Sequence, residues 1–314
     1  MRIFYGLIGL CIWCNSIYAE QLKFEKKTNH SSINLSYQWL DHQKQARQIA
    51  FSLDKKASQS HYRNQTDYKP QIAQRYVYVE LMKAAQQVNP KEARINMVQR
   101  GDRIEVSVKS RSAEMREKWI ANMSEKRESA FTQYLTDNHY TRFENYMGQI
   151  GVIPDHVRYV QESRPIILPV AQAIYDQLEE GSDTRDYVNR LLSWVQSIPY
   201  DTLESRIDSS GAGFYTPVEV LVNNKGDCDS KAALTASLMR SLLPDLSMSI
   251  VYLPGHALLA VNLGQRANEM SVELRGTNHV LLEPTGPAKV AIGVVSDETA
   301  RHIANGSYRA VSIP

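Results

Sequence analysis

The sequence predicts an α+β protein, and three observations support this fold class. Apolar residues recur every three or four positions in several segments, which is the pattern of amphipathic helices. In other segments apolar and polar residues alternate, which is the pattern of half-buried strands. The strand-like segments come mostly in pairs joined by short polar or glycine-containing turns, as in antiparallel hairpins. Helices packed on antiparallel sheets are therefore expected.

The composition is that of an ordinary soluble globular protein. Of the 314 residues, 43% are hydrophobic and 22% are charged, close to the usual proportions. This length allows one large domain or two medium ones. The formal net charge of +2 gives no support for a nucleic-acid partner, because such proteins usually carry a pronounced basic patch.

Residues 1–19 have the pattern of a secretory signal peptide. Arg2 precedes an apolar run at 3–14, and Ala19 ends a short segment suited to cleavage. The run is short for a membrane span, so cleavage after Ala19 is favoured over an uncleaved N-terminal anchor. No later apolar run in the sequence is long enough to cross a bilayer. We therefore expect an exported protein, periplasmic or secreted, with no stable membrane span after cleavage.

Export changes the meaning of the cysteines. The sequence contains Cys11, Cys14 and Cys228, and cleavage after Ala19 removes the first two. One cysteine then remains in an oxidising compartment. Such a thiol is paired between molecules, buried or reactive.

Residues 20–150 are expected to form a small N-terminal α+β module. Their pattern gives, in chain order, a loose polar start at 20–32, strands at 33–39 and 49–53, a polar loop at 55–68, a helix at 70–88, strands at 95–97 and 104–108, and a helix at 112–136 that could continue to 147. No chemical constellation stands out in it. Its histidines, His42, His61 and His139, lie in polar contexts and are expected to be solvated.

Residues 151–314 are expected to form the second domain, beginning near Gly151 and Pro154. Their pattern gives helices at 168–178 and 184–198, a long polar loop at 201–216, a helix from Cys228 that Pro244 stops, and strands at 248–252, 256–263, 272–274 and 279–282. Loops as long as the one before Cys228 are often functional. A helix followed by an antiparallel sheet results.

Cys228 lies where the first turn of its helix is expected. A helix N-terminus carries free N–H groups and partial positive charge, which lower the pKa of a thiol and bind an oxyanion. The alternative is a small buried core residue, the common fate of free cysteines. The polar neighbours Asp227 and Asp229 and the exported setting favour a reactive thiol.

A nucleophilic thiol needs a base, and the base needs an orienting acceptor. His256 is the best base, because it starts an apolar strand. His279 follows a turn, and His156 and His302 lie in polar segments. Glu283 ends another strand and is the candidate acceptor; adjacent antiparallel strands would bring it beside His256. Taken singly, His256 is as well explained by a strand-edge histidine, and Glu283 by a solvent-facing acid.

Three motifs together resemble the transglutaminase-like cysteine superfamily, in its bacterial exported branch. They are Gly-Asp-Cys-Asp-Ser-Lys-Ala at 226–232, Gly-His-Ala at 255–257 and Leu-Leu-Glu-Pro-Thr-Gly-Pro at 281–287. The resemblance covers about residues 185–290 and leaves the N-terminal module outside. The third position is Glu283, whereas the family usually carries Asp there.

The resemblance implies a papain-like core, in which a helix bearing the cysteine packs on an antiparallel sheet. It implies Cys228 as nucleophile, His256 as base and Glu283 as acid, with Gln196 as a candidate oxyanion donor. The expected activity is attack on amide bonds of polypeptides through a thioester, with hydrolysis favoured. Acyl transfer to an amine and a non-catalytic binding module that keeps the fold remain alternatives. No cofactor or metal is expected, and the expected substrate is a polypeptide, with the envelope and the cell wall as candidate sources.

Overall fold

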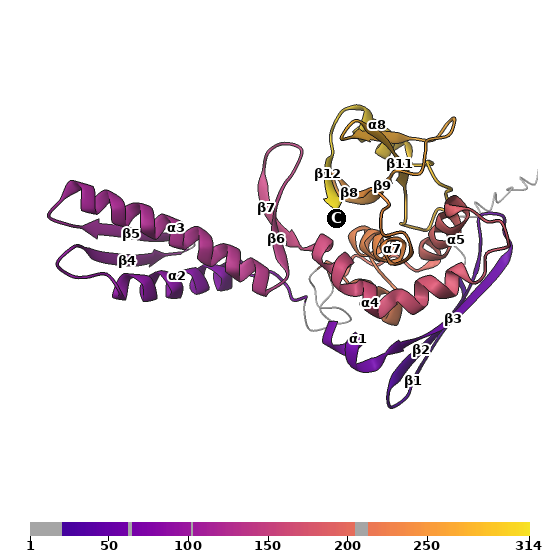
Figure 1. The fold of residues 1–314 in the computed structure, drawn as a ribbon, viewed down its shortest axis with the longest axis horizontal. Helices are drawn as coiled ribbons and strands as arrows, with labels where there is room; N and C mark the ends of the chain where they lie inside the picture. The colour runs from indigo at the N-terminus through magenta and orange to yellow at the C-terminus, as the bar shows by residue number, and fades with distance from the viewer. Residues whose placement is uncertain (1–20, 62–64, 102, 205–212) are drawn as a thin grey trace, which may run out of the picture.

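The computed structural model describes residues 21–61, 65–101, 103–204 and 213–314. The predicted signal segment lies outside the described residues, as does half of the predicted loop at 201–216. The protein belongs to the α+β class, as predicted, and its paired strands are antiparallel. Figure 1 shows a rounded body from which a long arm extends to one side.

The chain begins with a three-stranded sheet ordered β1-β2-β3. Its strands are β1 (Gln21–Thr28), β2 (Ser32–Leu40) and β3 (Ala46–Asp54). Strands β2 and β3 alternate as predicted, with every second side chain buried. The prediction of a loose segment at 20–32 is wrong, because β1 pairs along β2 and Phe24 packs on Tyr37 with ring centroids 5.0 Å apart.

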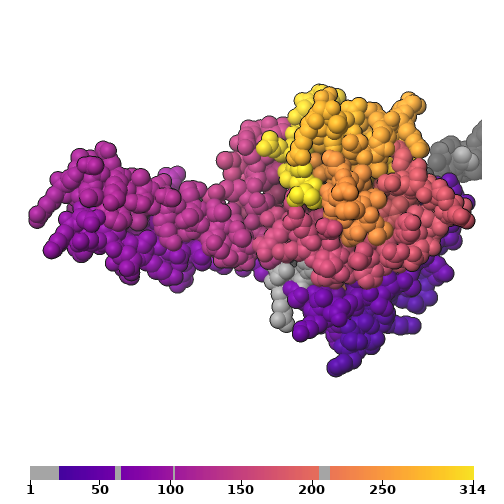
Figure 2. Space-filling view, in the orientation of Figure 1, coloured from indigo at the N-terminus to yellow at the C-terminus, as the bar shows by residue number. Residues whose placement is uncertain are grey.

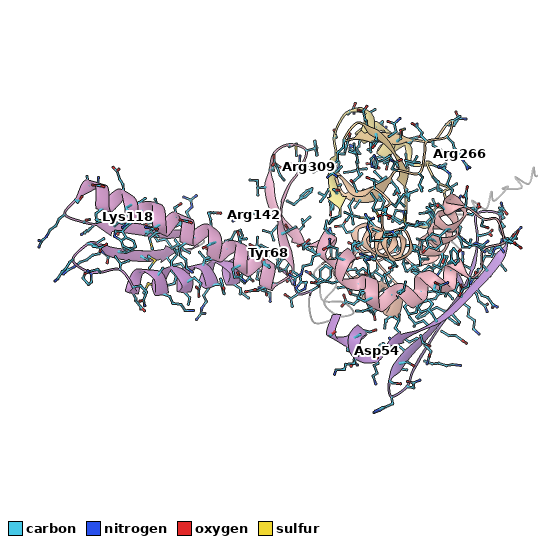
Figure 3. The ribbon with its side chains drawn as sticks, viewed as in Figure 1. Asp54, Tyr68, Lys118, Arg142, Arg266 and Arg309 are labelled. Carbon is cyan, nitrogen blue, oxygen red and sulfur yellow. The ribbon has the colours of Figure 1, made fainter. Side chains whose placement is uncertain are left out.

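The arm consists of two long helices and a hairpin. Its elements are α2 (Pro70–Gln86), β4 (Arg94–Arg100), β5 (Arg103–Lys109) and α3 (Ala113–Asp137). Figure 2 shows it standing away from the body, and Figure 3 places Lys118 toward its free end and Tyr68 at its base. The predicted elements are all present here.

Two expectations next to the arm are wrong. The segment at 55–68 was expected to be a loop, but α1 (Lys55–His61) forms directly after β3. The helix at 112–136 does not continue to 147, because His139 takes a positive φ of 57° and turns the chain. The residues that follow form the hairpin of β6 (Tyr140–Glu144) and β7 (Ile150–Pro154).

Four helices build the centre of the body. They are α4 (His156–Tyr175), α5 (Thr184–Ser197), α6 (Pro217–Asn223) and α7 (Cys228–Leu242). Helix α4 begins well before the predicted start, since Asp155 caps it by accepting from the Arg158 N–H. Helix α6 was not predicted; Thr216 and Glu219 form a capping box at its start.

The last sheet carries five strands in the order β10-β11-β9-β8-β12. They are β8 (Met248–Leu253), β9 (His256–Val261), β10 (Ser271–Leu274), β11 (Thr277–Leu282) and β12 (Arg309–Ile313). One face packs against α7, and the other forms a second apolar cluster that includes Ile303 of α8 (Asp297–Ala304). Burial on both faces explains why β9 is almost entirely apolar.

The main hydrophobic core runs across the boundary predicted at residue 150. Alternate residues of β2 and β3 pack in one cluster with α4, α5 and α7. Trp194 of α5 is fully buried and contacts the rings of Tyr37, Trp39 and Phe51. The indole N–H of Trp39 also donates to the Ser193 hydroxyl at 3.1 Å. The division of the hydrophobic core therefore does not fall at residue 150.

Candidate functional site

Cys228 is the first residue of α7, as the sequence predicted. Asp227 caps the helix by accepting from the Ser230 N–H at 3.0 Å. Gly226 sits against α6, where an added Cβ would lie 3.2 Å from Val220 Cγ2 and 3.3 Å from Ser230 Cβ. A side chain at Gly226 would therefore push the start of the helix out of place. The thiol is partly buried at this fixed N-terminus.

His256 and Glu283 meet across the ends of two neighbouring strands. Strands β9 and β11 pair antiparallel, with Leu259 opposite Leu282. This register brings the start of β9 close to the end of β11. His256 Nε2 lies 2.6 Å from Glu283 Oε2. The expected pairing of these two side chains is confirmed. Because Nε2 is engaged, the other ring nitrogen, Nδ1, is the one that remains for a reacting group.

Cys228 lies beside the start of the same strand. The backbone N–H of Ala257, the residue after His256, donates to the Cys228 sulfur and lowers its pKa. Among the described residues, no hydrogen bond joins Cys228 to His256 directly. The structure thus brings all three predicted residues to one end of β9, with the His256–Glu283 pair formed.

The thiol itself is held in its neutral form. Burial raises the pKa of Cys228 far above the ordinary value, and the charges of Asp229 and Asp227 raise it further. The Cys228 thiol donates to Asp229 Oδ1 at 3.4 Å. The expectation that the helix N-terminus lowers this pKa is therefore wrong for the resting protein, since two flanking carboxylates and burial outweigh it.

His256 shows the opposite balance. Burial disfavours the charged ring and lowers its pKa, but the hydrogen bond and charge of Glu283 raise it. Asp229 and Glu298 add to the rise, so the pKa of His256 ends above its ordinary value. Glu283 is itself buried, and its second oxygen, Oε1, accepts from the Thr285 N–H at 2.9 Å. The acid is therefore fixed on both oxygens.

Gln196 lies in the site but does not fit its expected role. Its amide nitrogen donates to the backbone carbonyls of Glu283, at 2.8 Å, and Val290, at 2.9 Å. An NH₂ group has two hydrogens, so neither is left for an oxyanion. The prediction is corrected: Gln196 holds the backbone that carries Glu283. His42, expected to be solvated, lies 3.0 Å from Gln196 Oε1 and supports it from the first sheet.

Lys231 lies one turn into α7 and is fully buried. Its ammonium donates to the Ile198 carbonyl. Burial lowers the pKa of Lys231 to about 8, against the charges of Glu283 and Asp227. Burial also raises the pKa of Asp227 to about 7, with the nearby Asp229 charge adding to it. Three ionisable side chains, those of Asp227, Asp229 and Lys231, therefore lie within three residues of Cys228 at the start of α7.

His156 is a residue of the site that the sequence pattern did not identify. It opens α4 and is completely buried, although it lies in a polar segment of the sequence. Its Nε2 is 3.8 Å from Asp229 Oδ2, and its Nδ1 is 2.6 Å from the Tyr252 hydroxyl. Only the fold brings these three residues together, because they come from α4, α7 and β8.

A pocket of about 430 Å³ opens beside the His256–Glu283 pair. It lies between the start of β9, the segment after β11 and α8, and its lining includes Glu298 and His302. A larger hollow of about 530 Å³ lies between the β2–β3 turn and α5. His256 and Glu283 line the smaller pocket and Cys228 does not, whereas none of the three residues lines the larger one.

Neither a metal cluster nor a membrane-spanning helix is present in the part of the chain that the structure describes. No three His, Cys, Asp or Glu side chains there are arranged to hold a metal ion. Likewise, none of the described helices combines the length and apolar character needed to cross a bilayer.

Comparisons with protein-family models, curated proteins and solved structures find no match for this chain. The likeness to the transglutaminase-like superfamily is therefore a resemblance of the three sequence motifs.

Proposed function

We propose that this protein is an exported cysteine amide hydrolase of the transglutaminase-like type. Cys228 is the nucleophile, His256 the base and Glu283 the acid that orients the base. The observation that carries the proposal is the 2.6 Å contact between His256 Nε2 and Glu283 Oε2, next to a cysteine at a helix N-terminus. Export rests on the signal-like segment at 1–19.

In the proposed reaction, the Cys228 sulfur attacks the carbonyl carbon of an amide while its proton passes to His256. N–H groups of the first turn of α7 face the developing oxyanion. The C–N bond then breaks, and His256 gives the proton to the leaving amine. Water hydrolyses the thioester, releasing a carboxylic acid and restoring the thiol. Glu283 stabilises the imidazolium in both steps.

Acyl transfer uses the same thioester, with a primary amine in place of water. Hydrolysis is the primary proposal, and the pocket that His256 and Glu283 line would admit water beside the base. The substrate class under both readings is a polypeptide of the cell envelope or its surroundings.

One observation favours a second candidate, a binding module that has kept the fold without the chemistry. Burial and the flanking carboxylates raise the pKa of Cys228, so the resting thiol is a weak nucleophile. The module reading predicts that this thiol stays inert when peptides are present.

The test is to trap the acyl-enzyme. The protein is mixed with synthetic peptides that contain glutamine and ordinary peptide bonds, with and without a fluorescent primary amine. Acid quenching and mass spectrometry then locate any adduct on the Cys228 peptide. A hydroxylamine-sensitive adduct is expected, with cleaved or deamidated peptide in water and labelled peptide with the amine if transfer dominates. Peptide turnover without such an adduct, or binding without turnover, would contradict the proposal.

A further inference from the structure

A second carboxylate and a second imidazole lie near Cys228. They belong to Asp229 and His156, and Tyr252 fixes the imidazole. The distances are 3.4 Å from Cys228 Sγ to Asp229 Oδ1, 3.8 Å from Asp229 Oδ2 to His156 Nε2 and 2.6 Å from His156 Nδ1 to the Tyr252 hydroxyl. The pair is separate from His256–Glu283, which uses other residues and other strands.

The environment of His156 fixes its orientation. The ring is completely buried and packs on Phe214 at 4.6 Å and on Tyr252 at 5.8 Å between ring centroids. Phe143 of the β6–β7 hairpin packs in turn on Tyr252 at 4.8 Å. An imidazole enclosed by aromatic rings in this way cannot turn away from Asp229 without disturbing the packing.

The hydrogen bonds fix its tautomer. Burial raises the pKa of Tyr252 well above its ordinary value and lowers that of His156, so a neutral phenol meets a neutral ring. The Tyr252 O–H donates to Nδ1, which leaves the single ring proton on Nε2, facing the Asp229 carboxylate. The reverse tautomer would aim a lone pair at that carboxylate. His156 Nε2 has no hydrogen-bond partner among the described residues although it is buried, and a buried polar atom without a partner calls for an explanation.

We propose that Asp229, which lies 3.8 Å from the buried His156 ring, accepts a hydrogen bond from the Cys228 thiol and so keeps the thiol neutral while no substrate is bound. Substrate that displaces Asp229 from the sulfur would leave His256 as the acceptor of the proton. Asp229 and His156 are thus positioning residues that act through Cys228. The inference deepens the proposed function and rests on it for its meaning.

Other charged and titratable groups also face the sulfur, and the test must separate them from Asp229. Asp227 precedes it on α7 and caps the helix. Tyr200 and Tyr252 both interact electrostatically with Cys228. On the β9 side, the sulfur meets the Ala257 N–H and the end of the strand that carries His256. Of the residues that the structure describes, Asp229 alone accepts a hydrogen bond from the thiol.

The experiment measures the rate of Cys228 alkylation by iodoacetamide between pH 5 and 10 in the full chain, with the modified peptide identified by mass spectrometry. Asp229→Asn removes one negative charge beside the sulfur, so alkylation is expected to be about ten-fold faster at pH 7 and at each pH where the thiol is still mostly protonated. Asp229→Glu keeps the charge and should stay close to the wild-type rate. Asp245→Asn, the same change at the far end of α7, is the matched control and should have no effect.

Tyr252→Phe tests the second half of the proposal. It removes the donor to His156 Nδ1 and preserves the ring packing, so a smaller acceleration than that of Asp229→Asn is expected. An unchanged or slower rate in Asp229→Asn would overturn the inference, and so would an Asp229→Glu rate as fast as that of Asp229→Asn. An unchanged rate in Tyr252→Phe would contradict the role proposed for His156 and Tyr252. Alkylation needs no substrate. The alkylation rates can therefore be interpreted even if the protein fails to cleave amides.

Discussion

The two carboxylate oxygens of Glu283 meet two different donors. Oε2 contacts His256, and Oε1 accepts from the Thr285 N–H two residues on. The turn after β11 therefore anchors the Glu283 side chain. The net effect is a pKa of His256 above its ordinary value. The pair stabilises the fold fully below about pH 6.5, and this contribution is lost as pH rises through the raised pKa.

Glu283→Gln is expected to lower the pKa of His256 by about one unit or more, because burial then acts without the opposing carboxylate. NMR titration of the His256 ring measures this directly. If the enzyme proposal holds, activity rises with pH as His256 loses its proton, and the variant moves that rise to lower pH. Its maximal rate should fall by about a hundred-fold or more. A His256 titration unchanged by Glu283→Gln would contradict the pairing.

Gly226 illustrates a requirement set by space alone. A Cβ there would press on Val220 and Ser230 at 3.2 and 3.3 Å. Gly226→Ala is expected to lower the free energy of unfolding by about 1–3 kcal/mol, as overpacking does. Gly151→Ala is the matched control: Gly151 has nothing within 4 Å of an added Cβ, so its effect should stay within about 0.5 kcal/mol. Urea unfolding compares the two, and equal effects would contradict the steric argument.

Among the elements, α7 combines an apolar body with a charged beginning. Its residues from Ser230 to Arg240 are all buried between α4 and the five-stranded sheet. Within this segment lies Lys231, whose ammonium bonds the Ile198 carbonyl at the end of α5. An ammonium group is costly to bury. Burial of the charged Lys231 therefore lowers the stability of the folded protein.

Lys231 should make stability depend on pH in the alkaline range. The pKa is about 8 in the folded protein and about 10.4 in the unfolded chain. Between these values the unfolded chain holds a proton that the folded chain has released, so stability rises with pH, by about 1.4 kcal/mol per unit at most. Lys231→Met should abolish this rise in urea unfolding, and Lys91→Met, an exposed control, should keep it. Equal pH slopes in wild type and Lys231→Met would refute the assignment.

For the whole molecule, one core links the first sheet to the helices that carry the site. Trp194 of α5 packs between Tyr37, Trp39 and Phe51, and the His42–Gln196 contact continues this link to Glu283. The arm has two small clusters of its own, one between α2, α3 and the β4–β5 hairpin and one between α2, α3 and the β6–β7 hairpin. We therefore expect the body and the arm to unfold as separate units.

Hydrogen exchange tests this division. Amides of β2 and α7 are expected to share the highest opening free energy, because they belong to one core. Amides of β4 and β5 should exchange at a lower free energy, because a two-stranded hairpin packed on one side buries less apolar surface. Opening of β2 at the lower free energy of the arm would show instead that residues 21–54 form part of a separate N-terminal unit.

Much of the fold could be predicted from periodicity, and the misses have physical causes. The spacing of apolar residues predicts strands β2 and β3 and helix α7. Strand β1 does not, because it lies at a sheet edge and its stability comes from pairing with β2 rather than from a buried face. The boundary at 150 was drawn from chain order, whereas packing joins β2 and β3 to helices more than a hundred residues later.

The candidate site shows the same limit. The motifs identified Cys228, His256 and Glu283, because each stands at the end of an element with a distinctive neighbour. They did not reveal His156 or the support that His42 gives to Gln196. Those contacts depend on where α4 and the β2–β3 turn lie in space, and neither histidine has a sequence partner at fixed spacing. The direction in which the pKa of Cys228 shifts likewise depends on burial of the thiol. The position of Cys228 in the sequence does not reveal that burial.

Cys228 is the proposed nucleophile. The most direct measurement compares amide cleavage in one peptide mixture by wild type and Cys228→Ala, with circular dichroism to establish that both are folded. The account predicts cleavage by wild type and a loss of about a thousand-fold or more in the variant, with the fold retained. Equal cleavage by both proteins would contradict the nucleophile assignment, and no cleavage by either would favour the binding module.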